Sequence, residues 1–515
     1  MRASHTRHHR EGSWGLLMRF NLRKLLWAVT SGSVSAVFVL IVVFVIYLDR
    51  RTDLQVWHLV ELDEEYTADA DVTTFDEYLA LEDRLFQQLD RLVYAAVPPV
   101  KGQAINRYSR GSLSDPQRWS PNWNRSFVLP KESPKAAVLL VHGMSDSPYS
   151  LRALGEQLNN AGAYVLGLRL PGHGTAPAGL VEVTWKDMDG AVRLAVRHLA
   201  QHAGGRPLYV VGYSTGAALA VNYALETLGD PALPGIDRIA VLSPAIGVTS
   251  AAALAVWQAR LGHLLGLEKL AWNDIQPEYD PFKYGSFAVN AGDVVYRLTS
   301  EIQRRITVLQ GQGRLGDFPP ILAFSSVVDA TVSTAALVKG LFARLPTGGH
   351  ELVLFDINRR AEIEPILGWN PSAIVSALQQ NPDRAYTLSI VTNEDPHSRQ
   401  VVVHRLAPGG TGAENATLGL CWPKDIYSLA HLALPFSPLD PLYGGHPEQP
   451  SPGIQLGEIA LRGERGVLQI GAGDMLRLRW NPFYPFVQRR LLQFFGLDGQ
   501  HPADHAFGDV SPPVR

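Results

Sequence analysis

The hydrophobic residues of this chain follow three successive patterns. The segment Leu25–Leu48 is predominantly apolar and has no charged side chain. Over residues 75–93 apolar positions recur at helical intervals, and Thr74 and Glu77 have capping-box spacing, which predicts an amphipathic helix packed on the body. From Pro134 onward, short β-rich runs alternate with helical segments. This alternation predicts an α/β fold, a mainly parallel sheet with helices on both faces.

Two segments interrupt the alternation. Residues 245–319 contain an Ala- and Leu-rich stretch followed by aromatic residues, which indicates a helical cap inserted over the sheet edge. Residues 358–425 are expected to form a second insertion, with a short helix near Ile374 and two strands. The predicted organisation is a tail (1–24), a membrane-spanning helix (25–48), an extension with the amphipathic helix (49–133), the α/β domain with its insertions (134–495) and a C-terminal tail (496–515).

The apolar run Leu25–Leu48 is long enough to cross a bilayer, because a helix rises ~1.5 Å per residue and the hydrocarbon layer is ~30 Å thick. Six basic residues and one acidic residue precede it, whereas an acidic run at 61–65 follows it. The positive-inside rule therefore predicts a single-pass anchor with the N-terminus cytoplasmic and the body outside, periplasmic in a bacterium. A cleaved signal peptide is the alternative, although no small-x-small cleavage site precedes Asp49.

The composition of the chain mainly excludes certain classes of protein and kinds of site. The chain has 515 residues, 46 Lys and Arg against 49 Asp and Glu, and a formal net charge of −3. This balance gives no basic surface for nucleic acid, and 46% hydrophobic residues rule out a wholly disordered chain. The single cysteine, Cys421, excludes a disulfide framework and a multi-cysteine zinc site. Without a G-x-G-x-x-G or P-loop pattern, we expect no metal, nucleotide or redox cofactor; composition leaves the oligomeric state open.

A candidate nucleophile lies between an expected strand and an expected helix. The strand Leu208–Val211 leads into Gly212-Tyr213-Ser214-Thr215-Gly216, and a helix-forming sequence follows. A G-x-S-x-G sequence in this context is typical of a serine held on a sharp, strained turn at the carboxyl edge of a sheet. The alternative for Ser214 is an ordinary helix N-cap.

The expected strand Ala137–Val141 leads into His142, Gly143 and Met144. Gly143 allows close approach of the main chain, so the backbone N–H groups of Met144 and Thr215 are predicted to form an oxyanion hole. His142 comes too early in the chain to be the base and is expected to order this loop.

The segments HGMSDSPYS, RLPGHGTAP and GYSTG, together with Trp185 and Asp187, resemble the α/β-hydrolase superfamily, in the serine hydrolase branch of monoacylglycerol lipases, carboxylesterases and related aminopeptidases. The resemblance covers residues 134–355 and resumes at 422–443. It implies an α/β-hydrolase fold with nucleophile, acid and histidine in that chain order. Asp329, after the expected strand 320–328, matches the acid; Asp317 and Asp356 are the alternatives.

The histidine departs from the family pattern, because none occurs between the expected strand Glu351–Phe355 and His397. His431 lies among apolar residues and prolines, in a segment resembling a serine-x-histidine-apolar-Pro-Phe sequence of bacterial relatives. We therefore predict His431 as the base, with His397, His404 and His446 as alternatives and a structural core histidine as the non-catalytic interpretation.

Together these features predict a membrane-anchored serine hydrolase acting on carboxylic esters. The aromatic residues of the cap are expected to line a pocket for a hydrophobic acyl chain: Trp272, Tyr279, Phe282 and Phe287. The expected partner is a small-molecule or lipid-like ester substrate, and the tether favours the lipid-like class. Amide or peptide hydrolysis and acyl transfer would use the same residues, and a catalytically silent, membrane-tethered binding module is the alternative from another class.

Overall fold

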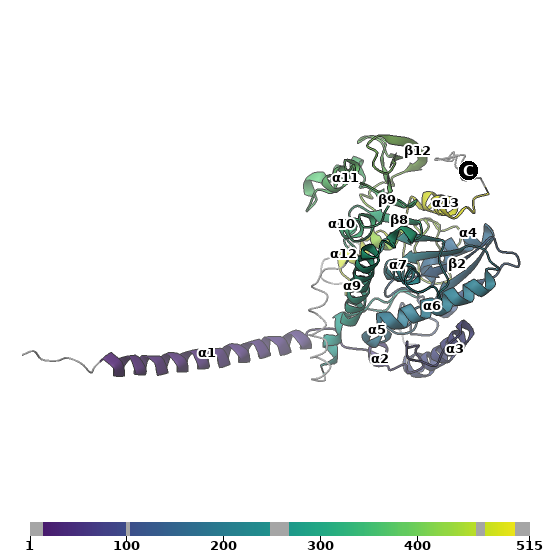
Figure 1. Cartoon of the computed structure of the whole chain (residues 1–515). Helices are drawn as coiled ribbons and strands as arrows, with labels where there is room; N and C mark the ends of the chain where they lie inside the picture. Colours follow the sequence, from purple (N-terminus) through teal and green to yellow (C-terminus); the bar gives the residue numbers. More distant parts are fainter. Residues whose placement is uncertain (1–13, 99–103, 248–266, 460–468, 500–515) are drawn as a thin grey trace, which may run out of the picture. The chain divides into compact units, whose positions relative to one another are not determined.

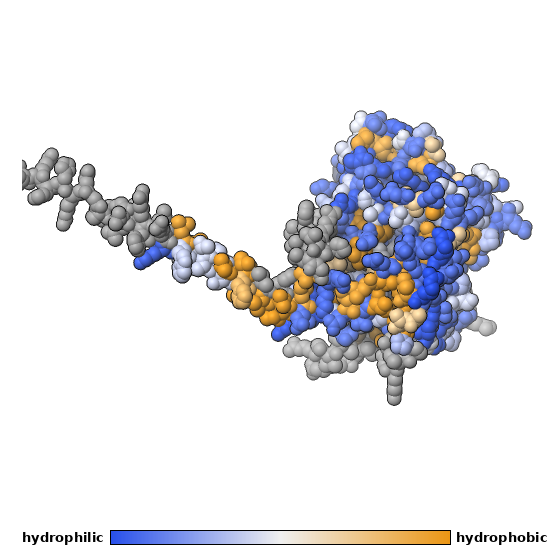
Figure 2. Space-filling model, turned by 90° about the horizontal axis from the view of Figure 1, so that it is seen from below, coloured by the Kyte–Doolittle hydropathy of each residue, from blue (hydrophilic) through white to orange (hydrophobic). Residues whose placement is uncertain are grey.

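The computed structural model describes residues 14–98, 104–247, 267–459 and 469–499. The chain divides into two compact units, Met1–Asp53 and Leu54–Arg515. The first unit contains one helix among its described residues, α1 (Trp14–Asp49). Its segment Lys24–Asp49 is long and apolar enough to cross a membrane, and Figure 2 shows hydrophobic residues along it. Length and composition suit both an anchor and a signal sequence.

The second unit begins with an extension that packs on the α/β body. It contains α2 (Val56–Leu59) and the amphipathic helix α3 (Phe75–Leu92). Thr74 caps α3 in a capping box with Glu77, as the sequence predicts. The apolar face of α3 is buried: Phe75 and Tyr78 join the main core, and Phe86 joins a smaller cluster with Trp57.

Ten strands form one twisted sheet in the order β1-β3-β2-β4-β5-β8-β9-β10-β11-β12. Neighbours from β3 to β10 run parallel, whereas β1, β11 and β12 pair antiparallel at the two edges. The strands are β1 (Phe127–Leu129), β2 (Ala136–Val141), β3 (Ala163–Leu168), β4 (Leu208–Tyr213), β5 (Arg238–Leu242), β8 (Ile321–Ser326), β9 (Glu351–Phe355), β10 (Thr387–Asn393), β11 (Gln400–Leu406) and β12 (Ala413–Cys421).

Helices cover both faces of this sheet, which confirms the predicted architecture (Figure 1). The α-helices after α3 are α4 (Tyr149–Asn160), α5 (Gly179–Glu182), α6 (Trp185–His202), α7 (Thr215–Thr227), α9 (Val289–Gly311), α10 (Thr334–Leu337), α11 (Pro371–Gln379), α12 (Ala472–Met475) and α13 (Tyr484–Phe495). Successive side chains of β2 point to opposite faces. Leu139 packs in the core with α3, α6, α7 and α9, whereas Val138 and Leu140 pack in the core with α4 and α13.

The structure corrects the first predicted insertion and confirms the short helix and the two strands of the second, α11, β10 and β11. Residues 248–266, in the first, lie outside the described residues. Within the range predicted as a cap, α9 is instead a core helix whose residues Leu298 and Ile302 are fully buried in the main core. The second insertion extends the main sheet, because β10 pairs parallel with β9. Its third strand, β12, was not predicted, because its residues are mostly exposed and carry no apolar alternation.

Candidate active site

Ser214 occupies the turn between β4 and α7, at the carboxyl edge of the sheet. Its backbone has φ 53° and ψ −112°, a strained conformation for a residue other than glycine. The Ser214 N–H donates to Leu242 O of β5 at 3.0 Å, and its carbonyl accepts from Ala245 N–H at 3.1 Å. These bonds hold the strained turn, so Ser214 is not an ordinary helix N-cap, and its side chain makes no capping bond.

A single relay of hydrogen bonds joins the three predicted catalytic side chains. His431 Nε2 lies 3.1 Å from Ser214 Oγ, and His431 Nδ1 lies 2.9 Å from Asp329 Oδ2. Ser214 and His431 are both buried, and the carboxylate of Asp329 is fully enclosed. The relay has the geometry in which a histidine takes a proton from a serine hydroxyl while a carboxylate orients the ring.

Asp329 follows β8 and is held as a carboxylate. Burial raises the pKa of Asp329, but the hydrogen bond from His431 and the N–H groups of Thr331 and Val332 lower it below its ordinary value. These two N–H groups donate to Asp329 Oδ1 at 2.8 and 3.0 Å, which leaves Oδ2 for the imidazole. The alternative acids lie elsewhere: Asp317 is exposed, and Asp356 pairs with Arg359 at 2.8 Å.

His431 begins a short 3-10 turn, His431–Ala433, that two asparagines tie to the body. Asn358, just after β9, donates its side-chain amide to Ile426 O at 2.8 Å. Asn481 bonds the other side of the loop, with its backbone N–H 2.9 Å from Phe436 O. Strand β9 and the C-terminal segment therefore fix the histidine loop from both sides.

The other candidate histidines do not reach Ser214. His397 and His446 are exposed, and the ring of His446 lies near Trp480. The Nδ1 atom of His404 contacts Asn415 Oδ1 at 2.6 Å across the β11–β12 pair.

The loop after β2 lies directly against the serine turn. A Cβ atom on Gly143 would lie 3.1 Å from Ser214 Cβ, and one on Gly216 would overlap the carbonyl oxygens of Val141 and His142. At Gly216 only glycine permits this close approach, and at Gly143 a Cβ would require its neighbours to shift by a few tenths of an ångström. The predicted oxyanion donors, Met144 N–H and Thr215 N–H, therefore lie on the two segments that meet at Ser214; their role stays a prediction.

His142 orders this loop, as expected. Its Nε2 accepts the Leu170 N–H at 3.0 Å, and its Nδ1 lies 2.8 Å from Gly143 O. Burial, with the neighbouring His173, keeps the pKa of His142 well below its ordinary value, so the ring is neutral. A neutral ring that accepts at Nε2 carries its proton on Nδ1 and donates it to Gly143 O.

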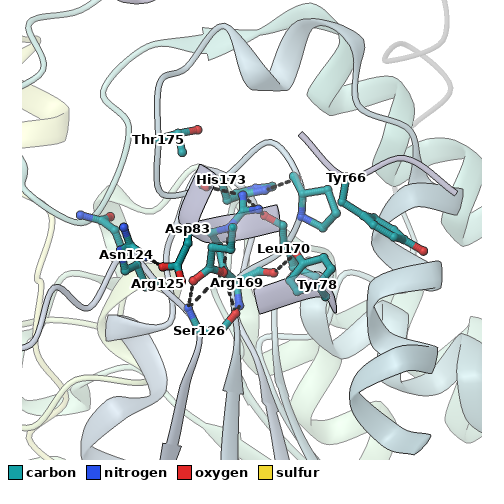
Figure 3. Close-up of polar contacts among 12 residues, drawn as sticks. Tyr66, Tyr78, Asp83, Asn124, Arg125, Ser126, Arg169, Leu170, His173 and Thr175 are labelled. Carbon is teal, nitrogen blue, oxygen red and sulfur yellow. Dashed lines mark hydrogen bonds and ion pairs between the residues drawn. The ribbon is translucent and has the colours of Figure 1, made fainter. Parts of the chain in front are cut away.

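Behind this loop lies a buried ion network that the sequence did not reveal. Arg169 is fully buried and forms ion pairs with Glu65 at 2.9 Å and Glu82 at 3.0 Å. Figure 3 shows Arg169 between Tyr78, Ser126 and His173. Although burial lowers the pKa of Arg169, the charges around it, those of Glu65 and Glu82 included, raise it well above its ordinary value. The N-terminal extension thus braces the loop that bonds His142.

A cavity of about 210 Å³ opens beside the relay. Residues adjacent in sequence to the site line it: Ser145 and Asp146 after the β2 loop, Tyr213 before Ser214, and Leu432 after His431. The rest of its wall mixes aromatic with charged side chains: Tyr279, Phe436 and Tyr443 with Asp280, Lys283 and Arg479. The charged side chains in this wall distinguish the cavity from the purely apolar acyl pocket that the sequence predicts.

The four predicted pocket residues divide into two pairs. Tyr279 and Phe287 line the cavity. Trp272 does not, because it is buried in the main core with its ring edge-on to His58. Phe282 does not either: it stacks on Tyr149 at 4.3 Å in a separate aromatic cluster. The prediction was wrong for Trp272, which packs in the main core, and for Phe282. The Phe282 N–H donates to Asp280 Oδ1 at 2.9 Å in a tight turn, and the Phe282 ring packs on Tyr149 instead of the cavity.

Parts of the chain are similar to known proteins. Residues 132–356 match the family described as "Serine aminopeptidase, S33". Over 122 residues the chain is 31% identical to a thermostable monoacylglycerol lipase from a Bacillus species; the alignment covers 24% of this chain and 46% of the lipase. The chain therefore spans less than half of the length of this curated relative.

Two solved structures are similar over part of the chain. A monoacylglycerol lipase from Paleococcus ferrophilus has 21% identity and a TM-score of 0.34, over 45% of this chain and 89% of the lipase. A monoglyceride lipase from Saccharomyces cerevisiae has 14% identity and a TM-score of 0.36, over 45% of this chain and 82% of that chain.

Proposed function

We propose that this chain, an α/β-hydrolase of the serine hydrolase branch, is a membrane-anchored enzyme that cleaves carboxylic esters through an acyl-enzyme intermediate. The observation that carries the proposal is the buried relay from Asp329 through His431 to Ser214, with contacts of 2.9 and 3.1 Å. The partial similarity to a monoacylglycerol lipase supports ester substrates.

In the proposed reaction, Ser214 Oγ attacks the carbonyl carbon of the ester while His431 Nε2 takes the hydroxyl proton. Asp329 holds the ring with its proton on Nδ1 and stabilises the imidazolium that forms. The N–H groups of Met144 and Thr215 stabilise the oxyanion, each worth about 3–4 kcal/mol of transition-state energy. His431 then protonates the leaving alcohol, and water activated by the same imidazole releases the acid.

Helix α1 supplies the proposed anchor. Its segment Lys24–Asp49 suits a bilayer, and the basic residues before it favour a cytoplasmic N-terminus. A catalytic unit tethered at a membrane would meet lipid-like esters at that surface. A reporter enzyme fused after Arg515 tests the topology: activity only outside the cytoplasm is expected, and cytoplasmic activity would contradict the proposal. A purified chain that begins near Asp49 would replace the anchor with a cleaved signal.

The activity is tested with para-nitrophenyl esters of increasing acyl length, with a peptide para-nitroanilide for the amide alternative. We expect turnover of esters by the purified chain and loss of that turnover in Ser214→Ala. Faster cleavage of the anilide would make the enzyme an amidase on the same relay. No turnover of either substrate class would leave the fold as a binding module.

A further inference from the structure

We propose that the cavity beside Ser214 binds an anionic group of the substrate, a carboxylate or a phosphate, through Arg479. The inference rests on the proposed function and adds the chemical class of the ester. It starts from the position of the cavity, which Tyr213 and Leu432, the neighbours of Ser214 and His431, both line. A group bound there belongs to the molecule whose ester bond meets the relay.

Arg479 is a buried cation of this wall. The residue is only 7% exposed, yet no carboxylate of the described residues lies within 4.0 Å of its guanidinium. Its Nη2 donates to Tyr279 Oη at 3.2 Å, and its Nε has no hydrogen-bond partner among the described residues. Burying a donor of a charged group without an acceptor is costly, so a ligand that supplies an anionic acceptor for Nε would be favoured.

The carboxylates near the same cavity are already engaged. Asp146 forms an ion pair with Lys283 at 3.2 Å. Asp280 accepts the hydroxyl of Tyr443 at 2.7 Å and the N–H groups of Phe282 and Lys283 at 2.9 and 3.1 Å. Asp274 and Asp474 lie at the exposed rim. The carboxylates of the inner wall therefore have their donors. Although burial lowers the pKa of Arg479, Tyr279 and the charge of Asp280 raise it, and Asp280 acts from beyond ion-pair distance. The Nε of Arg479 is the donor of this wall that still lacks an acceptor among the described residues.

A second guanidinium lies two residues away. Arg477 also lines the cavity, is partly buried, and reaches Thr331 Oγ1 at 3.4 Å, two residues beyond Asp329. Arginine presents a planar fork of donors that matches carboxylate and phosphate oxygens. The cavity of about 210 Å³ lies below the roughly 300–1,000 Å³ of drug-sized ligand sites, so it suits a short charged group better than a long acyl chain.

The test compares matched neutral and anionic esters. The first pair is para-nitrophenyl pentanoate and mono-para-nitrophenyl glutarate, which differ by a carboxylate on the acyl side. The second pair is monobutyryl glycerol and monobutyryl glycerol phosphate, which differ by a phosphate on the alcohol side. In at least one pair we expect Arg479→Met to raise KM for the anionic ester at least tenfold more than for the neutral one, as expected for loss of a charged hydrogen bond.

Arg304→Met is the matched control, because Arg304 is exposed on α9 and pairs with Glu301. It should leave the ratio between the two esters unchanged. Equal effects of Arg479→Met on both members of both pairs, or a wild-type enzyme that never prefers the anionic member, would overturn the inference. The wild-type preference decides the question even if Arg479→Met does not fold.

A binding measurement separates this inference from the proposed function. Ser214→Ala is titrated with glutarate and with glycerol phosphate by calorimetry, without any turnover. Binding of either anion that Arg479→Met abolishes in this background supports the site, whether or not esters are cleaved. Cleavage of neutral esters without binding of either anion keeps the proposed function and refutes the anion site.

Discussion

His431 Nε2 lies 3.1 Å from Ser214 Oγ, although 217 residues separate them in the chain. The serine stands at the end of β4, near the centre of the sheet, and the histidine follows the last strand of the sheet's extension. Asn358 and Asn481 return the histidine loop to the carboxyl edge, where Asp329 meets it. Spatial convergence, and not chain distance, therefore decides which histidine can serve the serine.

The relay predicts a sharp difference between two histidine substitutions. His431→Ala should lower kcat for ester cleavage by about a thousandfold or more, because it removes the proposed general base. His404→Ala is the matched control, since His404 lies at the β11–β12 edge and contacts Asn415. Steady-state kinetics with a para-nitrophenyl ester, together with circular dichroism, checks both variants. Comparable losses in the two folded variants would contradict the assignment.

Close packing at the serine turn predicts that one glycine is indispensable. In Gly216→Ala the new methyl group would overlap the backbone oxygens of Val141 and His142, and neither backbone can move without shifting the sheet. We expect loss of several kcal/mol of unfolding free energy, or insoluble protein. Gly316→Ala is the control, because nothing lies within 4 Å of its added Cβ. Denaturant unfolding measures both, and a stable Gly216→Ala variant would refute the packing argument.

The two aromatic residues that the sequence grouped together should behave differently. Phe282→Ala empties a place in the stack with Tyr149 and should cost about 3–5 kcal/mol of stability. Phe287→Ala alters the wall of the cavity and should change KM more than the unfolding free energy. Thermal unfolding and ester kinetics on both variants check this difference. If Phe282→Ala and Phe287→Ala change the unfolding free energy and KM to the same extent, the distinction between the two residues is wrong.

Burial of His58 predicts a pH-dependent stability. His58 Nδ1 accepts the Gln55 N–H at 2.9 Å, Nε2 contacts Ser286 Oγ at 2.9 Å, and burial lowers the pKa of His58 to about 4. Between pH 6.5 and 4 the unfolded chain binds a proton here that the folded chain does not. The contribution of His58 to the unfolding free energy should therefore fall by about 1.4 kcal/mol per pH unit as the pH decreases through this window, in addition to the contributions of other buried histidines such as His350.

His58→Gln should remove that contribution. Urea unfolding of the full chain at pH 5 and pH 6 measures the slope, with His404→Gln as the control. An identical slope in wild type and His58→Gln would show that His58 does not titrate in this window.

Much of the fold could be predicted from local sequence patterns. The strands β2, β3, β4, β5, β8 and β9 and the capped helix α3 follow from apolar runs and capping residues, whose physics is local. The exposed strand β12 has no such pattern, because its neighbour β11 supplies its pairing. A polar turn likewise decides the direction of Phe282, so composition alone could not separate it from Phe287.

The strand-to-helix context and the family resemblance predicted Ser214, Asp329 and His431 as the catalytic residues. The sequence could not reveal Arg169 between Glu65 and Glu82, because an ion pair across about a hundred residues leaves no local periodicity. In the sequence, the acidic run near Glu65 indicates only the orientation of the chain in a membrane. Arg479 was missed for the same reason, since only the folded chain brings the C-terminal segment to the cavity.

The central claim, that Ser214 is an activated nucleophile, is tested most directly by labelling with a fluorophosphonate probe followed by peptide mapping of the full chain. The account predicts one adduct, on the peptide that contains Ser214, with labelling abolished in Ser214→Ala and strongly slowed in His431→Ala. An unlabelled wild-type chain, an adduct on another residue, or equal labelling rates in wild type and His431→Ala would contradict it.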